Sequence, residues 1–129
     1  MAVEGKYETW AMEAAEDMDT LNAGTGHLHK AVDAARTIAA TGDEAIGILK
    51  HAGKNTEHIT VGVSGIMKYV ASAAIVAGAR ISATTSGYFV TATSGTYVNG
   101  QNLDVAVASG AVGTGLFHFG VSNYLTDSN

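Results

Sequence analysis

Residues 59–71 read Ile-Thr-Val-Gly-Val-Ser-Gly-Ile-Met-Lys-Tyr-Val-Ala, and this stretch decides the fold class. Ile59, Val61 and Val63 lie on one face of an extended chain, because side chains in a strand alternate between its two faces. Such a period of two predicts a half-buried β-strand. The Ser-Gly pair at 64–65 then predicts a tight hairpin turn that leads into a second strand.

The same pattern of short apolar alternations between glycine-rich turns continues from Gly24 to the end of the chain. With 16 glycines and no proline, the turns depend on Gly, Asn, Asp and Ser. Asn99-Gly100 predicts a type I′ hairpin, because both central residues of that turn need a positive φ. Several short strands at regular spacing predict a sandwich or a barrel. Three further strands are expected, whose apolar faces are Tyr88, Val90 and Ala92, then Leu103, Val105 and Val107, then Phe117, Phe119 and Val121.

Residues 29–40 fit two kinds of secondary structure. Ala31, Ala35 and Ala39 follow helical spacing, and alanine is a good helix former and a poor strand former. The β pattern that follows favours a strand over 28–34 instead. Both alternatives stay open, and we expect the strand.

The net charge of −5 is concentrated at the amino-terminal end. Residues 1–20 contain six carboxylates and one lysine, which gives −5, and the other 109 residues balance six acids against six bases. From Ile81 onward only Asp104 and Asp127 are charged. The chain therefore offers no basic patch to neutralise phosphates, and we expect no nucleic-acid partner.

The first 23 residues are expected to form an N-terminal arm attached to a single β domain over 24–129. The arm contains the only tryptophan of the chain, and aromatic residues and methionine are enriched in protein interfaces. An extended arm and a frayed tail remain alternatives to a short helix, which is predicted by the spacing of Trp10, Ala14, Met18 and Leu21. The candidate residues for binding a partner or a neighbouring subunit are Tyr7, Trp10, Met12 and Met18.

No residue pattern indicates catalysis, cofactor binding or metal binding. His27 and His29 would supply half of a zinc site that His51, His58 or His118 could complete, but no Cys or Glu follows at ligand spacing. No Gly-x-Ser-x-Gly motif is present, and the glycine-rich stretch 110–115 lacks the lysine of a phosphate-binding loop. We expect no catalytic residue, no cofactor, no metal and no small-molecule substrate, and therefore no enzyme.

No segment predicts export or membrane insertion. Residues 1–10 lack the apolar region of a signal peptide. Residues 70–79 are too few and too rich in alanine to span a bilayer. We expect no membrane partner.

The body has a characteristic order of turn glycines and apolar alternations. In chain order, these segments are Asp43-Glu-Ala-Ile-Gly-Ile-Leu49, Gly53, the strand Ile59-Thr-Val-Gly-Val-Ser-Gly65, the run Ala74-Ile-Val-Ala-Gly78 before Ile81, and a second unit that ends at Leu116-Phe-His-Phe-Gly120. Over residues 24–121 this order resembles the small capsid decoration (cement) proteins of tailed bacteriophages.

The resemblance implies a mainly β fold, a compact β-barrel or β-tulip body with an extended or short-helical N-terminal arm. It also implies a homotrimer on the outer surface of the virion, at three-fold and quasi-three-fold positions. There the protein would bind the major capsid protein and stabilise the head, after synthesis in the cytoplasm of the bacterial host. An uncharged body is consistent with this role, because it lacks the edge charges that keep monomeric sheets apart.

A second hypothesis comes from a different class of protein. The chain would then be a small ligand- or carbohydrate-binding β-module of a phage tail or fibre. Such a module needs exposed aromatic platforms, and the candidates are Tyr88, Tyr97 and Tyr124. Tyrosines in strands more often pack against neighbours across the sheet.

Overall fold

The computed structural model describes residues 5–16, 18, 28–40, 44–93, 97–119 and the backbone of 123–124. This part of the chain is mainly β, as predicted, and its only helical element is the 3₁₀ turn η1 (Thr85–Gly87). The strands are β1 (Tyr7–Glu13), β2 (Ala31–Asp33), β3 (Ala45–His51), β4 (His58–Val70), β5 (Ile75–Val76), β6 (Arg80–Ala83), β7 (Phe89–Thr91), β8 (Tyr97–Val98), β9 (Gly100–Asn102), β10 (Ala106–Val107), β11 (Val112–His118) and β12 (Asn123–Tyr124).

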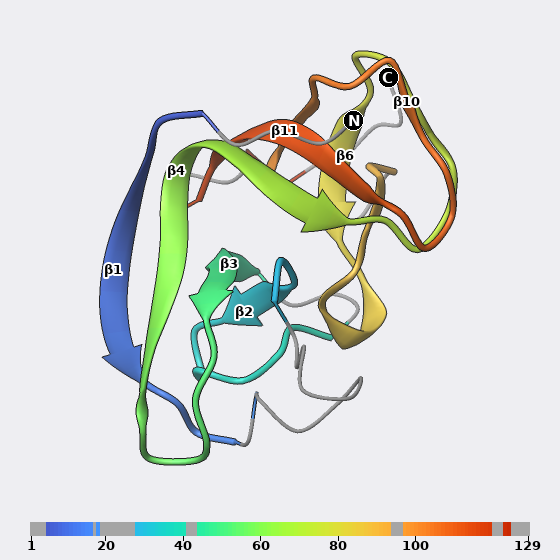
Figure 1. Cartoon of the computed structure of the whole chain (residues 1–129). Coiled ribbons are helices and arrows are strands. Elements are labelled where there is room, and N and C mark those ends of the chain that lie inside the picture. The colour runs from blue at the N-terminus through green and yellow to red at the C-terminus, as the bar shows by residue number, and fades with distance from the viewer. Residues whose placement is uncertain are drawn as a thin grey trace.

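The 13-residue strand β4 organises the barrel. Its first half pairs with β1 and β3, and its second half pairs with β11. The hairpin predicted at 64–65 is therefore wrong, because β4 continues through it and bends (Figure 1). Gly65 has a φ of +120°, a conformation open to glycine, and it pairs with Tyr7 of β1 and Phe117 of β11. The glycine makes a bend where the sequence pattern predicts a reversal.

The main sheet has eight strands and forms a nearly closed barrel (Figure 1). Its order is β2-β3-β4-β11-β9-β6-β7, and β1 adds to β4 beside this path. The two ends of the path approach each other through backbone hydrogen bonds. Gly87 N–H, next to β7, donates to Ala39 O at 2.8 Å, and Ala39 N–H donates to Ala31 O of β2 at 3.0 Å. The compact β-barrel body expected from the sequence is confirmed.

The bend in β4 divides the interior into two apolar clusters. Ile59 and Val61, from the first half of the strand, belong to the smaller cluster, and Met67 and Tyr69, from the second half, belong to the larger one. Four aromatic rings fill the larger cluster with centroids 5.3–6.5 Å apart, the spacing at which ring pairs stabilise each other. These rings are Tyr69, Phe89, Phe117 and Phe119.

The type I′ hairpin predicted at Asn99-Gly100 is also wrong. The residues before and after it pair with different strands, β8 with β12 and β9 with β6 and β11. Asn99 is buried, and its side-chain Oδ1 accepts a hydrogen bond from Ala83 N–H at 2.9 Å. The side chain of Asn99 thus satisfies a backbone N–H of the neighbouring strand β6. The extended chain can then pass from β8 in one sheet to β9 in the next without a turn.

The predicted strand faces have different outcomes. Phe117 and Phe119 are buried as expected, with exposed neighbours at 116 and 118. In β7 the prediction was wrong, because the buried residue is Phe89, whose ring belongs to the aromatic cluster. At 103–107 only Val107 is buried.

Side-chain hydrogen bonds explain why 103–105 is a loop instead of a strand. Asp104 N–H donates to Asn102 Oδ1 at 3.1 Å, and Asp104 Oδ2 accepts from Thr114 N–H at 3.1 Å. These bonds satisfy the backbone locally and leave Leu103 and Val105 facing solvent, 49% and 85% exposed. Alternation alone did not reveal this competition between side chains and the strand ladder.

The ambiguous segment 28–40 forms a short strand followed by a turn, so the expected strand is confirmed over Ala31–Asp33. Asp33 Oδ1 accepts hydrogen bonds from Ala35 N–H at 3.1 Å and from Thr37 N–H at 3.2 Å. Arg36 has a φ of +65°. A carboxylate that caps the turn and a left-handed residue within it exclude the alternative helix.

The bend at Gly65 predicts an unequal response of two positive-φ glycines to alanine. Gly65→Ala would place a Cβ against Lys6 O and within 2.5 Å of Tyr7 Cα, so we expect the free energy of unfolding to fall by about 3 kcal/mol. Gly110→Ala is the matched control, since Gly110 has a φ of +80° and an added methyl there would meet no atom within 4 Å. Its loss should be about 1 kcal/mol. Urea denaturation measures both, and equal losses would contradict the role of Gly65.

Burial predicts a pH dependence for Tyr69. Desolvation, with a smaller contribution from Asp104, raises the pKa of its phenol from 10.0 to about 12, and its hydroxyl donates to Asn102 Oδ1 at 3.0 Å. Because the raised pKa favours the protonated form in the folded state, this contribution is complete below pH 10 and is lost as the pH rises from 10 towards 12. Tyr69→Phe should cost about 1 kcal/mol near neutral pH.

The measurement is the unfolding midpoint of both proteins between pH 8 and pH 12, a range that brackets the two pKa values. The difference between wild type and Tyr69→Phe should narrow above pH 10. A difference that stays constant across this range would contradict the raised pKa.

Candidate binding surfaces

The amino-terminal segment lies in the sheet as an edge strand. Residues 7–13 are extended and pair antiparallel with β4, with a β-bulge between Glu8 and Thr9. The short helix predicted from the spacing of Trp10, Ala14 and Met18 is therefore wrong over these residues, because β4 offers a free edge that satisfies the extended backbone. The expected boundary of the arm at residue 23 lies outside the described residues.

The chain after β1 crosses over the smaller core cluster. Ala14 N–H donates to Glu57 O and Met18 N–H donates to Gly53 O, both at 2.9 Å. Glu16 Oε2 accepts a hydrogen bond from Ile38 N–H at 2.6 Å. The first two bonds fix the segment against the turn between β3 and β4, and the third fixes it against the chain that follows β2.

The structure separates the four candidate contact residues. Met12 and Met18 are buried in the smaller core cluster, so their side chains are not at the surface of this fold. Tyr7 is half-buried against the larger cluster, and Lys50 Nζ lies 5.2 Å from the centre of its ring. Trp10 alone is widely exposed, at 61%.

The exposure of Trp10 is unusual for its position. It pairs with Val61, and Met12 pairs with Ile59, so the indole lies on the same face of the sheet as three buried side chains. Among the described residues, β1 has β4 as its only strand neighbour, and its outer edge meets no other strand. An open backbone edge beside an uncovered indole is a surface suited to an added strand or an apolar partner.

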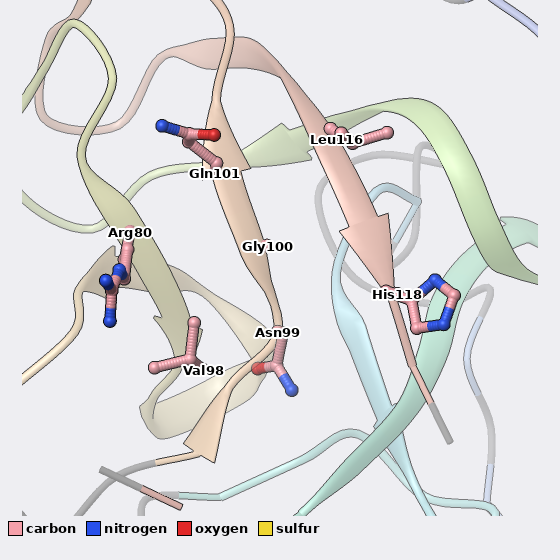
Figure 2. A pocket seen from close by; sticks show the side chains of 7 residues that line it. All are labelled: Arg80, Val98, Asn99, Gly100, Gln101, Leu116 and His118. Atoms are coloured by element: carbon pink, nitrogen blue, oxygen red, sulfur yellow. The ribbon is translucent and has the colours of Figure 1, made fainter. Parts of the chain in front are cut away.

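A second surface is an open groove of about 440 Å³ on another part of the barrel (Figure 2). Its side chains come mainly from three neighbouring strands, β6, β9 and β11, with Leu116 and His118 spaced along β11 (Figure 2). Gln101 Nε2 donates to Gly78 O at 2.9 Å, which fixes that amide. The described lining residues are Arg80, Val98, Asn99, Gly100, Gln101, Leu116 and His118.

Sequence reasoning missed this groove because its residues are separated by up to 38 positions and meet only through strand pairing. One signal was present in the sequence, since Arg80 is the last cationic residue of the chain apart from histidine. A lone cation before a long uncharged stretch is a candidate for a functional contact.

The tyrosines proposed as a carbohydrate platform do not line the groove. Tyr88 is half-buried and lies 4.6 Å from Lys30 Nζ, measured from the ring centre. Tyr97 lies on β8 and is half-buried, and the side chain of Tyr124 is outside the described residues. The described lining contains no tyrosine, tryptophan or phenylalanine that could act as a stacking platform for a sugar.

The described residues contain no candidate metal cluster and no candidate membrane-spanning helix. No group of three or more His, Cys, Asp or Glu side chains in this part of the chain is placed to hold a metal ion. His27, half of the suggested zinc pair, lies outside the described residues. Within the same ranges, no helix has the length and apolar character needed to cross a bilayer.

The fold has a counterpart among solved structures. No protein-family model and no curated protein matches the chain in sequence. In three dimensions it is similar to the crystal structure of the N base of head fiber gp8.5 of bacteriophage phi29, with a TM-score of 0.66 and 11% sequence identity. The similarity covers 87% of this chain and 94% of that chain. At this identity it shows that the two share a β-barrel fold.

The placement of Trp10 and Met18 predicts that their replacement by alanine has unequal effects on stability. Trp10→Ala should change the free energy of unfolding by no more than about 0.5 kcal/mol, because the indole is mostly solvated. Met18→Ala should cost about 2–5 kcal/mol, because it empties a fully buried site. Urea denaturation followed by circular dichroism measures both. A loss for Trp10→Ala as large as that for Met18→Ala would mean that the indole is covered in solution.

Proposed function

We propose that this chain is a structural protein of a tailed-bacteriophage head that binds the outer surface of the capsid, acts as a trimer and stabilises the shell. The observation that carries the proposal is the shared fold with a phage head fiber base, over 94% of that chain. The sequence-level resemblance to capsid decoration proteins supports the same setting independently.

The contact with the shell is assigned to the open edge of β1. Main-chain hydrogen bonds to an added strand provide affinity at such an edge, and side chains beside it provide selectivity. Trp10 is the side chain placed to provide this selectivity, because its exposed indole lies next to that edge and on the core-facing side of the sheet. An apolar segment of the major capsid protein that covered this ring would complete the sheet.

Stabilisation of a shell requires only modest affinity for each contact. Three linked copies raise the effective concentration of the second and third contacts, and avidity can then exceed a single affinity by about 10²–10⁴-fold. No catalytic step is part of this role, and we propose none for the chain.

The test is co-sedimentation of the purified chain with expanded heads that were prepared without it. We expect saturable binding, and we expect Trp10→Ala to weaken it at least about tenfold, as for an aromatic anchor at an interface. Val105→Ala is the matched control, since Val105 is 85% exposed but lies far from β1 along the chain, in the loop before β10. It should bind like wild type. Absence of binding by the wild-type chain would refute the proposal, and equal binding by Trp10→Ala would refute the role of the β1 edge.

A further inference from the structure

The groove in the barrel wall is built on paired strands, which hold its side chains at fixed spacings. Arg80 of β6 lies opposite Gln101 of β9, and Gln101 lies opposite Leu116 of β11. Residues directly opposite each other in paired strands project from the same face of the sheet. At about 4.8 Å for each strand spacing, the backbones of Arg80 and Leu116 are roughly 10 Å apart. A cation and an aliphatic side chain therefore lie on the two sides of β9 (Figure 2).

The guanidinium of Arg80 has no partner in the part of the chain that the structure describes. Arg80 is exposed, and its side chain makes no hydrogen bond or ion pair with a described residue. The described lining of the groove contains no carboxylate. Asp104 is the only acidic residue in the sequence 81–119, and its Oδ2 accepts a hydrogen bond from Thr114 N–H at 3.1 Å. The described lining therefore does not neutralise the positive charge of the groove.

The charges of β1 are too distant to neutralise Arg80. Four strand spacings separate β6 from β1, through β9, β11 and β4, and at about 4.8 Å each these amount to roughly 19 Å along the sheet. Exposed charges separated by more than the Debye length, about 8 Å at physiological ionic strength, are largely screened. Glu8 of β1 also lines a separate pocket together with Lys6, which carries the opposite charge. The charge of Arg80 is thus open to a binding partner.

The other groups of the lining favour a peptide over a sugar. Leu116 is 48% exposed, and Val98 in the same lining is half-buried. These aliphatic side chains can cover another aliphatic side chain, whereas the described lining has no tyrosine, tryptophan or phenylalanine as a platform for a sugar ring. Gln101 Nε2 donates to Gly78 O at 2.9 Å, which leaves Gln101 Oε1 to accept a hydrogen bond from a peptide N–H.

We propose that this groove binds an acidic peptide segment of a partner protein, with a carboxylate on Arg80 and an aliphatic side chain on Leu116. The planar guanidinium donates two parallel N–H···O bonds to one carboxylate, which also fixes the direction of the peptide. In an extended peptide, residues i and i+2 project from the same face about 7 Å apart. A Glu-x-Leu sequence meets this requirement, and the long side chain of Arg80 covers the remaining distance.

This inference goes beyond the proposed capsid contact and does not depend on it. The described lining of the groove contains no residue of β1, whose open edge and Trp10 are assigned to the shell. One molecule can therefore bind the shell through β1 and an acidic peptide through the groove.

The test is a titration of the isotope-labelled full chain with the peptide N-acetyl-Glu-Ser-Leu-amide, followed by NMR chemical shifts at low salt. We expect saturable shifts of the amides of Gly100 and Gln101 at about millimolar peptide. The neutral peptide N-acetyl-Gln-Ser-Leu-amide should bind at least about tenfold more weakly, because it lacks the carboxylate that pairs with the guanidinium.

Substitutions in the chain separate the role of Arg80 from that of positive charge in general. Arg80→Gln should weaken binding of the acidic peptide at least about tenfold. Arg36→Gln is the matched control, because it removes the only other arginine of the chain, which is exposed and lies outside the groove lining. It should bind like wild type. Leu116→Ala should weaken binding about threefold or more, through lost aliphatic contact.

The inference is overturned by a wild-type chain that shows no saturable shifts, by equal binding of the two peptides, or by Arg80→Gln that binds like wild type. Stronger binding of glucuronate than of the acidic peptide would also overturn it, because the groove would then be a site for an acidic sugar. None of these results bears on co-sedimentation with heads. Conversely, a chain that ignores heads but binds the acidic peptide through Arg80 would refute the capsid proposal alone.

Discussion

The barrel depends on one strand that has hydrogen-bonded neighbours in both of its halves. β4 holds β1 and β3 along its first half and β11 along its second, and the change of partner occurs around Gly65. A residue with a side chain at this position would meet the backbone of β1. Because both apolar clusters lie against β4, the bend also sets where each cluster forms. The rest of the sheet extends outward from this one strand.

The class of fold was predictable from the sequence because strand alternation is a local property. Ile59, Val61, Phe117 and Phe119 show a period of two, and all four are buried. Errors occurred where a side chain or a distant strand competes with the local signal. The glycine at 65 bends a strand instead of reversing it, and Asn99 satisfies Ala83 N–H instead of forming a turn. Neither effect is visible before the neighbouring strands are known.

The candidate surfaces were predictable only in part, and for a related reason. Trp10 was singled out because the only tryptophan lies in an acidic segment, and it is indeed exposed. Met12 belongs to the core because β1 pairs with β4 and carries its side chain inward. Met18 belongs to it because the chain after β1 is hydrogen-bonded to Gly53 O. The groove around Arg80 and His118 exists only through the pairing of β6, β9 and β11. Its residues have no common motif along the chain.

The pairing of β1 with β4 has a consequence for biosynthesis. Tyr7 is made 58 residues before its partner Gly65, so at about 5–20 residues per second β1 emerges roughly 3–12 s before the strand that it joins. During that interval a strand-forming segment with two free edges is tethered to the ribosome. Copies made on neighbouring ribosomes of one messenger expose the same segment together, which makes early encounters between nascent chains a hazard that rapid completion of β4 limits.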